Sequence, residues 1–273
     1  MGTTAVRRTT IGSVAGLALL ALAAPATATT SDTAQLSVLH GVPDLTVDVY
    51  VNGENTLDNF EPATLAGPLE LPAGTYTVAI TAADAADDSE PVLGPVDLTL
   101  ESGGNYTAVA HLDADAAPTV SFFTNDTSTT SAGEGRLTVR HTAAAPAVDI
   151  LAGDQAVITN LSNGSEEVLN LAAATVPAAI AAAGTTEAVL GPVDVPVEEG
   201  VNTIVYAWGS LEDGTLDVAT QTVTGLHSAP HGVPTGLVPV DEPAAPTGAL
   251  LAGGVALLLV AALGTRRLVR NRA

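Results

Sequence analysis

Short runs of alternating apolar and polar residues occupy the middle of the chain. Within residues 75–81, Tyr76, Val78 and Ile80 stand at every second position, and threonines lie mostly between them. A period of two places successive side chains on opposite faces of a β-strand. Turn-forming pairs of the Asn-Gly, Asp-Gly and Gly-Gly types recur between these runs. The pattern therefore predicts roughly seven or eight short strands per ~90 residues, without helical spacers.

Two of these runs, residues 106–111 and 203–208, are the most apolar and are predicted to be central strands. Residues 172–183 have a composition that favours a helix, but Pro177 lies in their middle. Proline disrupts a helix interior, and this segment aligns with the alternating run at residues 74–81. It is therefore predicted to be a strand.

The chain carries an internal duplication. The string Val-Leu-Gly-Pro-Val-Asp at residues 92–97 returns at 189–194, and a similar polar turn follows each copy. Upstream, Leu-Ser-Val-Leu-His at 36–40 corresponds to Leu-Thr-Val-Arg-His at 137–141. Matching strings at long spacing indicate repeated structural units. Each Gly-Pro pair is predicted to mark a bulge, or the point where a strand enters or changes sheets, because proline cannot donate to a central ladder.

The predicted fold is all-β, with two tandem immunoglobulin-like β-sandwich domains. They are expected at residues 35–125 and 136–225, with residues 126–135 as the linker. The chain has no cysteine, which excludes disulfides and thiolate metal sites. A domain of ~90 residues is long enough to hold a core without them.

Residues 1–28 are typical of a secretory signal peptide. Arg7 and Arg8 form a positive region, an apolar stretch follows, and small residues at 26–28 resemble a cleavage site. The arginine pair also suggests the twin-arginine export route. The residues that follow it match that motif poorly, so the general secretory route is favoured.

Three segments are predicted after the second domain: a Pro/Gly-rich stalk at residues 226–246, a transmembrane or sorting helix at 247–265, and a basic tail at 266–273. The apolar stretch is just long enough to cross a bilayer. The arginines that follow it place the C-terminus in the cytoplasm before any processing. The domains are therefore expected on the extracellular face of the cell membrane or in the cell wall.

A short motif stands at the start of this apolar stretch. It resembles the Leu-Ala-x-Thr-Gly variant of actinobacterial sortase substrates and consists of Ala244, Ala245, Pro246, Thr247 and Gly248. Ala244 stands where that motif has leucine. Such a signal would attach the protein to peptidoglycan through a sortase, but a plain membrane anchor is the favoured interpretation.

Charge is distributed unevenly along the chain. It has 30 Asp and Glu against 8 Lys and Arg, and Arg136 and Arg140 are the only arginines within residues 32–242. Such an acidic surface repels nucleic acid and anionic lipid headgroups, so no nucleic-acid partner is predicted. It attracts divalent cations diffusely, and a solvated surface is favoured over specific calcium storage.

Two pairs of histidine and aspartate side chains, each on a predicted hairpin, are the candidate functional residues. His40 ends one alternating run and Asp48 lies in the next, and His141 and Asp149 repeat this arrangement. The favoured hypothesis is that each pair forms a buried hydrogen bond that fastens its hairpin. The alternative is the base of a hydrolase, but no Gly-x-Ser-x-Gly nucleophile motif occurs. A calcium site using Asp44 and Asp48 lacks a close run of oxygen ligands. No catalytic residue, cofactor or metal ligand is predicted.

The first repeat resembles the family catalogued as domain of unknown function 4397. The resemblance rests on His-Gly-Val-Pro-Asp at residues 40–44, Val-Asp-Val-Tyr-Val-Asn-Gly at 47–53 and Leu-Pro-Ala-Gly-Thr-Tyr at 71–76. The second repeat keeps His141 and Asp149 but lacks the last of these strings. The resemblance implies a secreted or surface-anchored β-rich domain, often duplicated in actinobacteria, and no known activity comes with it.

These features predict a non-enzymatic cell-surface protein of the adhesion, envelope-structural or ligand-capture type. Its expected partner outside the cell is an unidentified ligand or protein. The alternatives are a secreted hydrolase using the His/Asp hairpin and a small-ligand or carbohydrate-binding module. A carbohydrate module would need exposed aromatic side chains, and most of the few aromatic residues stand at alternating strand positions that suit a core.

Overall fold

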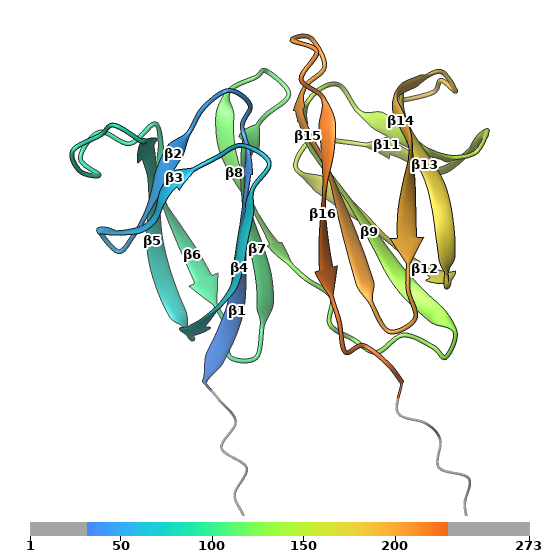
Figure 1. Cartoon of the computed structure of the whole chain (residues 1–273), viewed down its shortest axis with the longest axis horizontal. Helices are drawn as coiled ribbons and strands as arrows, with labels where there is room; N and C mark the ends of the chain where they lie inside the picture. The colour runs from blue at the N-terminus through green and yellow to red at the C-terminus, as the bar shows by residue number, and fades with distance from the viewer. Residues whose placement is uncertain (1–31, 229–273) are drawn as a thin grey trace, which may run out of the picture. The chain divides into compact units, whose positions relative to one another are not determined.

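The computed structural model describes residues 32–228, and every regular element in that range is a β-strand (Figure 1). The predicted all-β class is confirmed. The signal peptide, the sorting motif, the apolar helix, the basic tail and nearly all of the stalk were predicted for residues outside this range. In the described part of the chain, no helix long and apolar enough to cross a membrane is found.

The first repeat forms two four-stranded sheets with the orders β4-β1-β7-β8 and β3-β2-β5-β6. Strand β1 pairs antiparallel with β4 and parallel with β7. The strands are β1 (Thr33–Gly41), β2 (Val47–Val51), β3 (Glu54–Phe60), β4 (Leu65–Pro72), β5 (Gly74–Ala82), β6 (Leu93–Leu100), β7 (Asn105–Leu112) and β8 (Pro118–Thr124).

The second repeat has the same topology, with the sheet orders β12-β9-β15-β16 and β11-β10-β13-β14. Here β9 and β15 form the parallel pair. Strand β13 is the alanine-rich segment that was predicted to be a strand. The strands are β9 (Glu134–Ala144), β10 (Val148–Ala152), β11 (Gln155–Leu161), β12 (Ser165–Ala172), β13 (Ala174–Ala182), β14 (Ala188–Val197), β15 (Asn202–Ser210) and β16 (Asp217–Val223).

The sandwich architecture agrees with the prediction, but the strand order is not that of an immunoglobulin domain. In that fold the first and second strands share a sheet, whereas β1 and β2 lie in different sheets here. The physical reason is that β1 already has a ladder partner on each side, β4 and β7. The chain therefore crosses to the other sheet before β2 begins.

Each repeated Gly-Pro pair lies at a bulge, as predicted. The peptide bonds from Gly94 and Gly191 to the following prolines are cis. The pairing register between β5 and β6 shifts between Val78 and Ile80, opposite the first pair, and a matching shift occurs in the second repeat. At Gly94 φ is +92°, and an added Cβ would lie 2.7 Å from the Val78 carbonyl oxygen. Only glycine fits this close approach.

The central strands of the two repeats are buried on both faces. All but one residue of β7 and every residue of β15 are buried. One face of each strand turns into its own sandwich, and the other turns toward the neighbouring repeat. There Leu39, Val109 and Phe123 of the first repeat form one cluster with Ile204 and Tyr206 of the second. The missing polar alternation in β7 and β15 follows from this double burial.

A buried arginine lies in the same interface. The guanidinium of Arg140 on β9 donates to Glu166 Oε2 at 2.7 Å, to the Tyr206 hydroxyl at 2.7 Å and to Asn125 Oδ1 at 2.8 Å. It also stacks over the Phe123 ring, 4.2 Å from the centroid. Phe123 lies on β8 of the first repeat, and Asn125 directly follows that strand. Because Arg140 lies on β9 of the second repeat, its side chain joins the two repeats.

Side-chain hydrogen bonds extend from this arginine across the interface. The Tyr206 hydroxyl donates to Gln221 Oε1 at 2.5 Å, and the Thr107 hydroxyl donates to the same oxygen at 3.0 Å. Gln221 in turn donates through Nε2 to the Ser37 hydroxyl at 3.2 Å. Buried polar groups that are fully paired define one packing arrangement. The two repeats accordingly belong to one compact unit.

Phe123→Ala should lower the free energy of unfolding by about 3–5 kcal/mol, because it removes a ring packed between the repeats. Urea denaturation of the wild type and the variant measures this difference. Val92→Ala, at a side chain that is 49% exposed, serves as the control and should change the free energy by less than about 0.5 kcal/mol. An equally small effect of Phe123→Ala would contradict the packed interface.

Candidate functional site

The predicted hydrogen bond between His40 and Asp48 is not the one that forms. The Nε2 atom of His40 lies 2.6 Å from the Leu45 carbonyl oxygen. Asp48 instead accepts from the Asn59 backbone N–H at 2.8 Å and from the Asn55 side-chain amide at 3.1 Å. Both side chains are buried as expected, but His40 interacts with the loop between β1 and β2, and Asp48 interacts with strand β3.

The second repeat shows the same division of roles. The Nε2 atom of His141 lies 3.0 Å from the Pro146 carbonyl oxygen. Asp149 accepts from the Asn160 backbone N–H at 2.7 Å and from Gly184 N–H at 2.8 Å. The predicted pairing of His141 with Asp149 is therefore also wrong.

Each aspartate supports an unusual backbone conformation. Asn59 and Asn160 have φ values of +51° and +57°, in the left-handed region. A carboxylate that binds the N–H of such a residue stabilises the irregular β3 and β11 edges. The distance of 11 residues from Asp48 to Asn59 recurs from Asp149 to Asn160. That matched spacing is the sequence signal that reveals the real partner.

The histidines are poor candidates for a general base that meets substrate. Burial lowers the pKa of His40 and His141, which favours the neutral ring. Because a carbonyl oxygen only accepts, Nε2 carries the proton in each case. The other nitrogen of His40 is buried without a partner, and that of His141 lies 3.4 Å from the Ala143 N–H. Within residues 32–228, no group of three or more acidic or histidine side chains is placed to hold a metal ion.

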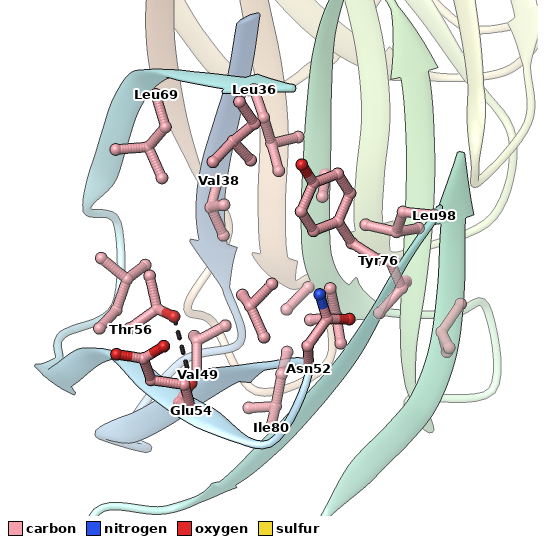
Figure 2. Close-up of a pocket in the computed structure, with 18 residues that line it drawn as sticks. Leu36, Val38, Val49, Asn52, Glu54, Thr56, Leu69, Tyr76, Ile80 and Leu98 are labelled. Carbon is pink, nitrogen blue, oxygen red and sulfur yellow. Dashed lines mark hydrogen bonds between the residues drawn. The ribbon is translucent and has the colours of Figure 1, made fainter. Parts of the chain in front are cut away.

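The first sandwich contains an apolar cavity between its two sheets (Figure 2). Its volume is 280 Å³, about twice the ~150 Å³ of an engineered apolar cavity that binds benzene. Leucine, valine and isoleucine side chains line most of it, among them Leu36, Val49, Leu69 and Ile80. Leu69 belongs to edge strand β4 and is only half-buried, so the cavity reaches the surface between the sheets.

A few polar and aromatic groups complete the lining. Asn52 comes from the turn between β2 and β3, Glu54 and Thr56 lie on β3, and Tyr76 comes from β5 (Figure 2). Asn52 Oδ1 accepts from the Thr77 N–H at 2.9 Å, and the Tyr76 hydroxyl donates to a backbone carbonyl at 2.7 Å. Among the lining side chains, Glu54 carries the one carboxylate, and the lining has no arginine or lysine.

The second repeat has two separate hollows in the corresponding region. One is a void of 50 Å³ between the sheets, and the other is a cleft of 330 Å³ beside β11 and β12. Both are lined by Leu137 and Ile150, which correspond to Leu36 and Val49. The apolar hollow is thus common to the two repeats, but its shape differs.

One substitution between the repeats helps to explain the difference in volume. Ala108 on β7 lines the large cavity, and Val205 on β15 occupies the matching position and lines the small void. A larger side chain at this point fills space that remains open in the first repeat. The alternating pattern identified these positions as core. It did not show that the core is incompletely filled.

Comparison with known proteins identifies one family. Residues 34–151 match the family model described as "Domain of unknown function (DUF4397)". The match runs from β1 through most of β10, so this part of the chain is similar to that family. No curated protein matches the chain.

Asp48→Ala should lower the free energy of unfolding by about 1–3 kcal/mol, because the Asn59 N–H loses its acceptor. Asp149→Ala should have a similar effect through Asn160. Asp48→Asn keeps one acceptor oxygen and is the matched control, with a smaller expected loss. Chemical denaturation gives all three values, and wild-type stability of Asp48→Ala would exclude this role.

Stability should fall as the solution becomes acidic from neutral pH. Burial lowers the pKa of His40, His111 and His141 below that of an unfolded histidine, so the unfolded chain binds more protons. The stabilisation from neutral rings is complete above about pH 6.5 and is lost below it. Each histidine contributes a slope of at most ~1.4 kcal/mol per pH unit.

Urea titrations between about pH 7.5 and about pH 5.5 test this expectation, since carboxyl groups of ordinary pKa titrate lower. His111→Gln should make the slope shallower, because the buried ring between Leu112 O and Ser121 Oγ is removed. Stability that does not change over this range would contradict the neutral, buried state of the histidines.

Proposed function

We propose that the protein is a non-enzymatic, ligand-capturing protein of the outer cell surface, and that the first repeat binds a small apolar molecule. The observation that carries the proposal is the 280 Å³ cavity, which is lined mainly by aliphatic side chains and reaches the surface. Small-molecule sites are usually concave and mostly apolar, with few polar groups. The cavity has all three properties.

The position of the cavity also supports binding. The central strands β7 and β15 are buried on both faces, and the Arg140 interactions hold the interface between them, whereas β3 and β4 are edge strands. A ligand can enter beside an edge strand without breaking a ladder between strands. Placement at the cell surface is proposed from the N-terminal signal and C-terminal apolar segment in the sequence.

The hydrolase alternative has less support. Its proposed base, the histidine of each hairpin, lies in the core and interacts through Nε2 with a backbone carbonyl. Neither His40 nor His141 lines the apolar hollows. A ligand in the first cavity would therefore meet aliphatic groups, Tyr76 and the polar residues of the β2–β3 hairpin.

Binding of the neutral fluorescent probe N-phenyl-1-naphthylamine tests the proposed function. The full chain, purified without detergent, should bind the probe with an increase in probe fluorescence. Leu69→Trp places a larger side chain in the cavity lining and should weaken binding at least about tenfold, or ~1.4 kcal/mol.

Leu169→Trp is the matched control, because Leu169 lines the cleft of the second repeat at the corresponding position. It should leave binding to the first cavity unchanged. Wild-type binding by Leu69→Trp, or a wild-type chain that does not bind the probe, would refute the proposed function. Circular dichroism of each variant shows whether its fold is retained.

A further inference from the structure

The charge at the first cavity indicates which ligands it prefers. Glu54 is exposed at the start of β3 and belongs to the cavity lining. The ion pairs found within residues 32–228 are formed by Arg136 and Arg140, so Glu54 has no cationic side chain as a partner there. A carboxylate beside an apolar hollow can interact with a positive group on a ligand.

The wider surroundings have the same sign. Residues 32–125 contain fifteen Asp and Glu residues and no lysine or arginine. An anionic ligand, such as a fatty carboxylate, would enter this field without a fixed positive charge to meet it. A cationic ligand would be attracted at long range and then by Glu54 at close range.

The second repeat lacks this polar set. At the positions of Asn52, Glu54 and Tyr76 it has Gly153, Gln155 and Val176. The apolar part of the hollow is nevertheless retained there, in the cleft of 330 Å³. The duplication therefore provides an internal comparison between two apolar hollows, one with a carboxylate at its lining and one without.

We propose that the first cavity is a site for cationic amphiphiles, in which an alkyl or aryl body fills the space between the sheets and an ammonium group lies at Glu54. The proposal rests on the apolar-ligand function proposed above and adds selection by charge. The ligand class is defined by its chemistry: an apolar body with one positive, hydrogen-bonding head.

Three ligands with ten carbon atoms each separate charge from apolar contact: decylammonium, decan-1-ol and decanoate. Calorimetry on the full chain, without detergent and below micelle formation, should rank their affinities in that order. Decylammonium should bind about tenfold or more tightly than decanoate at low salt. Added salt should reduce the difference, because exposed charges are screened.

Glu54→Gln introduces the side chain that the second repeat has at this position. It should lower the affinity for decylammonium about fivefold and leave decan-1-ol unchanged. Glu70→Gln removes an equal charge from edge strand β4, where Glu70 alternates with the lining residues Leu69 and Leu71. This control should bind all three ligands as the wild type does.

The outcomes distinguish the two proposals. If decan-1-ol binds and all three heads bind equally well, the charge selection is wrong and the apolar site stands. The same conclusion follows if Glu54→Gln has no effect, or if Glu70→Gln has the same effect. If none of the three ligands binds, the proposed function and the charge selection both fail.

Discussion

The buried guanidinium of Arg140 is the constraint on which the arrangement of the two repeats depends. A charge removed from water is tolerated only when all its donors are paired. Each of the three guanidinium nitrogens of Arg140 donates one hydrogen bond, to Glu166 and Tyr206 of its own repeat and to Asn125 of the connection after the first. The first repeat has Leu39 at the corresponding position. The interface between the repeats provides hydrogen-bond acceptors for the Arg140 guanidinium and also buries the Leu39 side chain.

The packing of the repeats divides the molecule into an inner and an outer part. The inner sheets contain the parallel pairs, and their central strands β7 and β15 are covered on both faces. The apolar hollows open beside edge strands of both layers: β3 and β11 belong to the outer sheets, and β4 and β12 belong to the inner sheets. Residues of the inner sheet, among them Leu36, Leu69 and Ala108, form one wall of the first cavity, and the interface between the repeats holds this wall in place.

Much of the local structure could be predicted because it depends on neighbours in the chain. The period of two, the Gly-Pro bulges and the strand around Pro177 all follow from backbone geometry. The strand order and the partners of His40 and Asp48 could not be predicted in this way. They depend on which groups the fold brings together, and a histidine and an aspartate near one hairpin have several possible partners. In the structure, His40 interacts with the backbone carbonyl of Leu45, and Asp48 accepts from the backbone N–H of Asn59.

The sequence alone determined the all-β class, the repeated sequence strings and the acidic charge, because composition and periodicity carry them directly. Only the tertiary structure decided that β1 and β2 lie in different sheets, that Arg140 is buried between repeats, and that one sandwich keeps a cavity. The cavity is a difference between the volume enclosed by two sheets and the volume of the side chains inside. In the sequence, Ala108 has the pattern of an ordinary core residue. Its small side chain leaves a cavity only because the opposite sheet fixes the volume that the core side chains must fill.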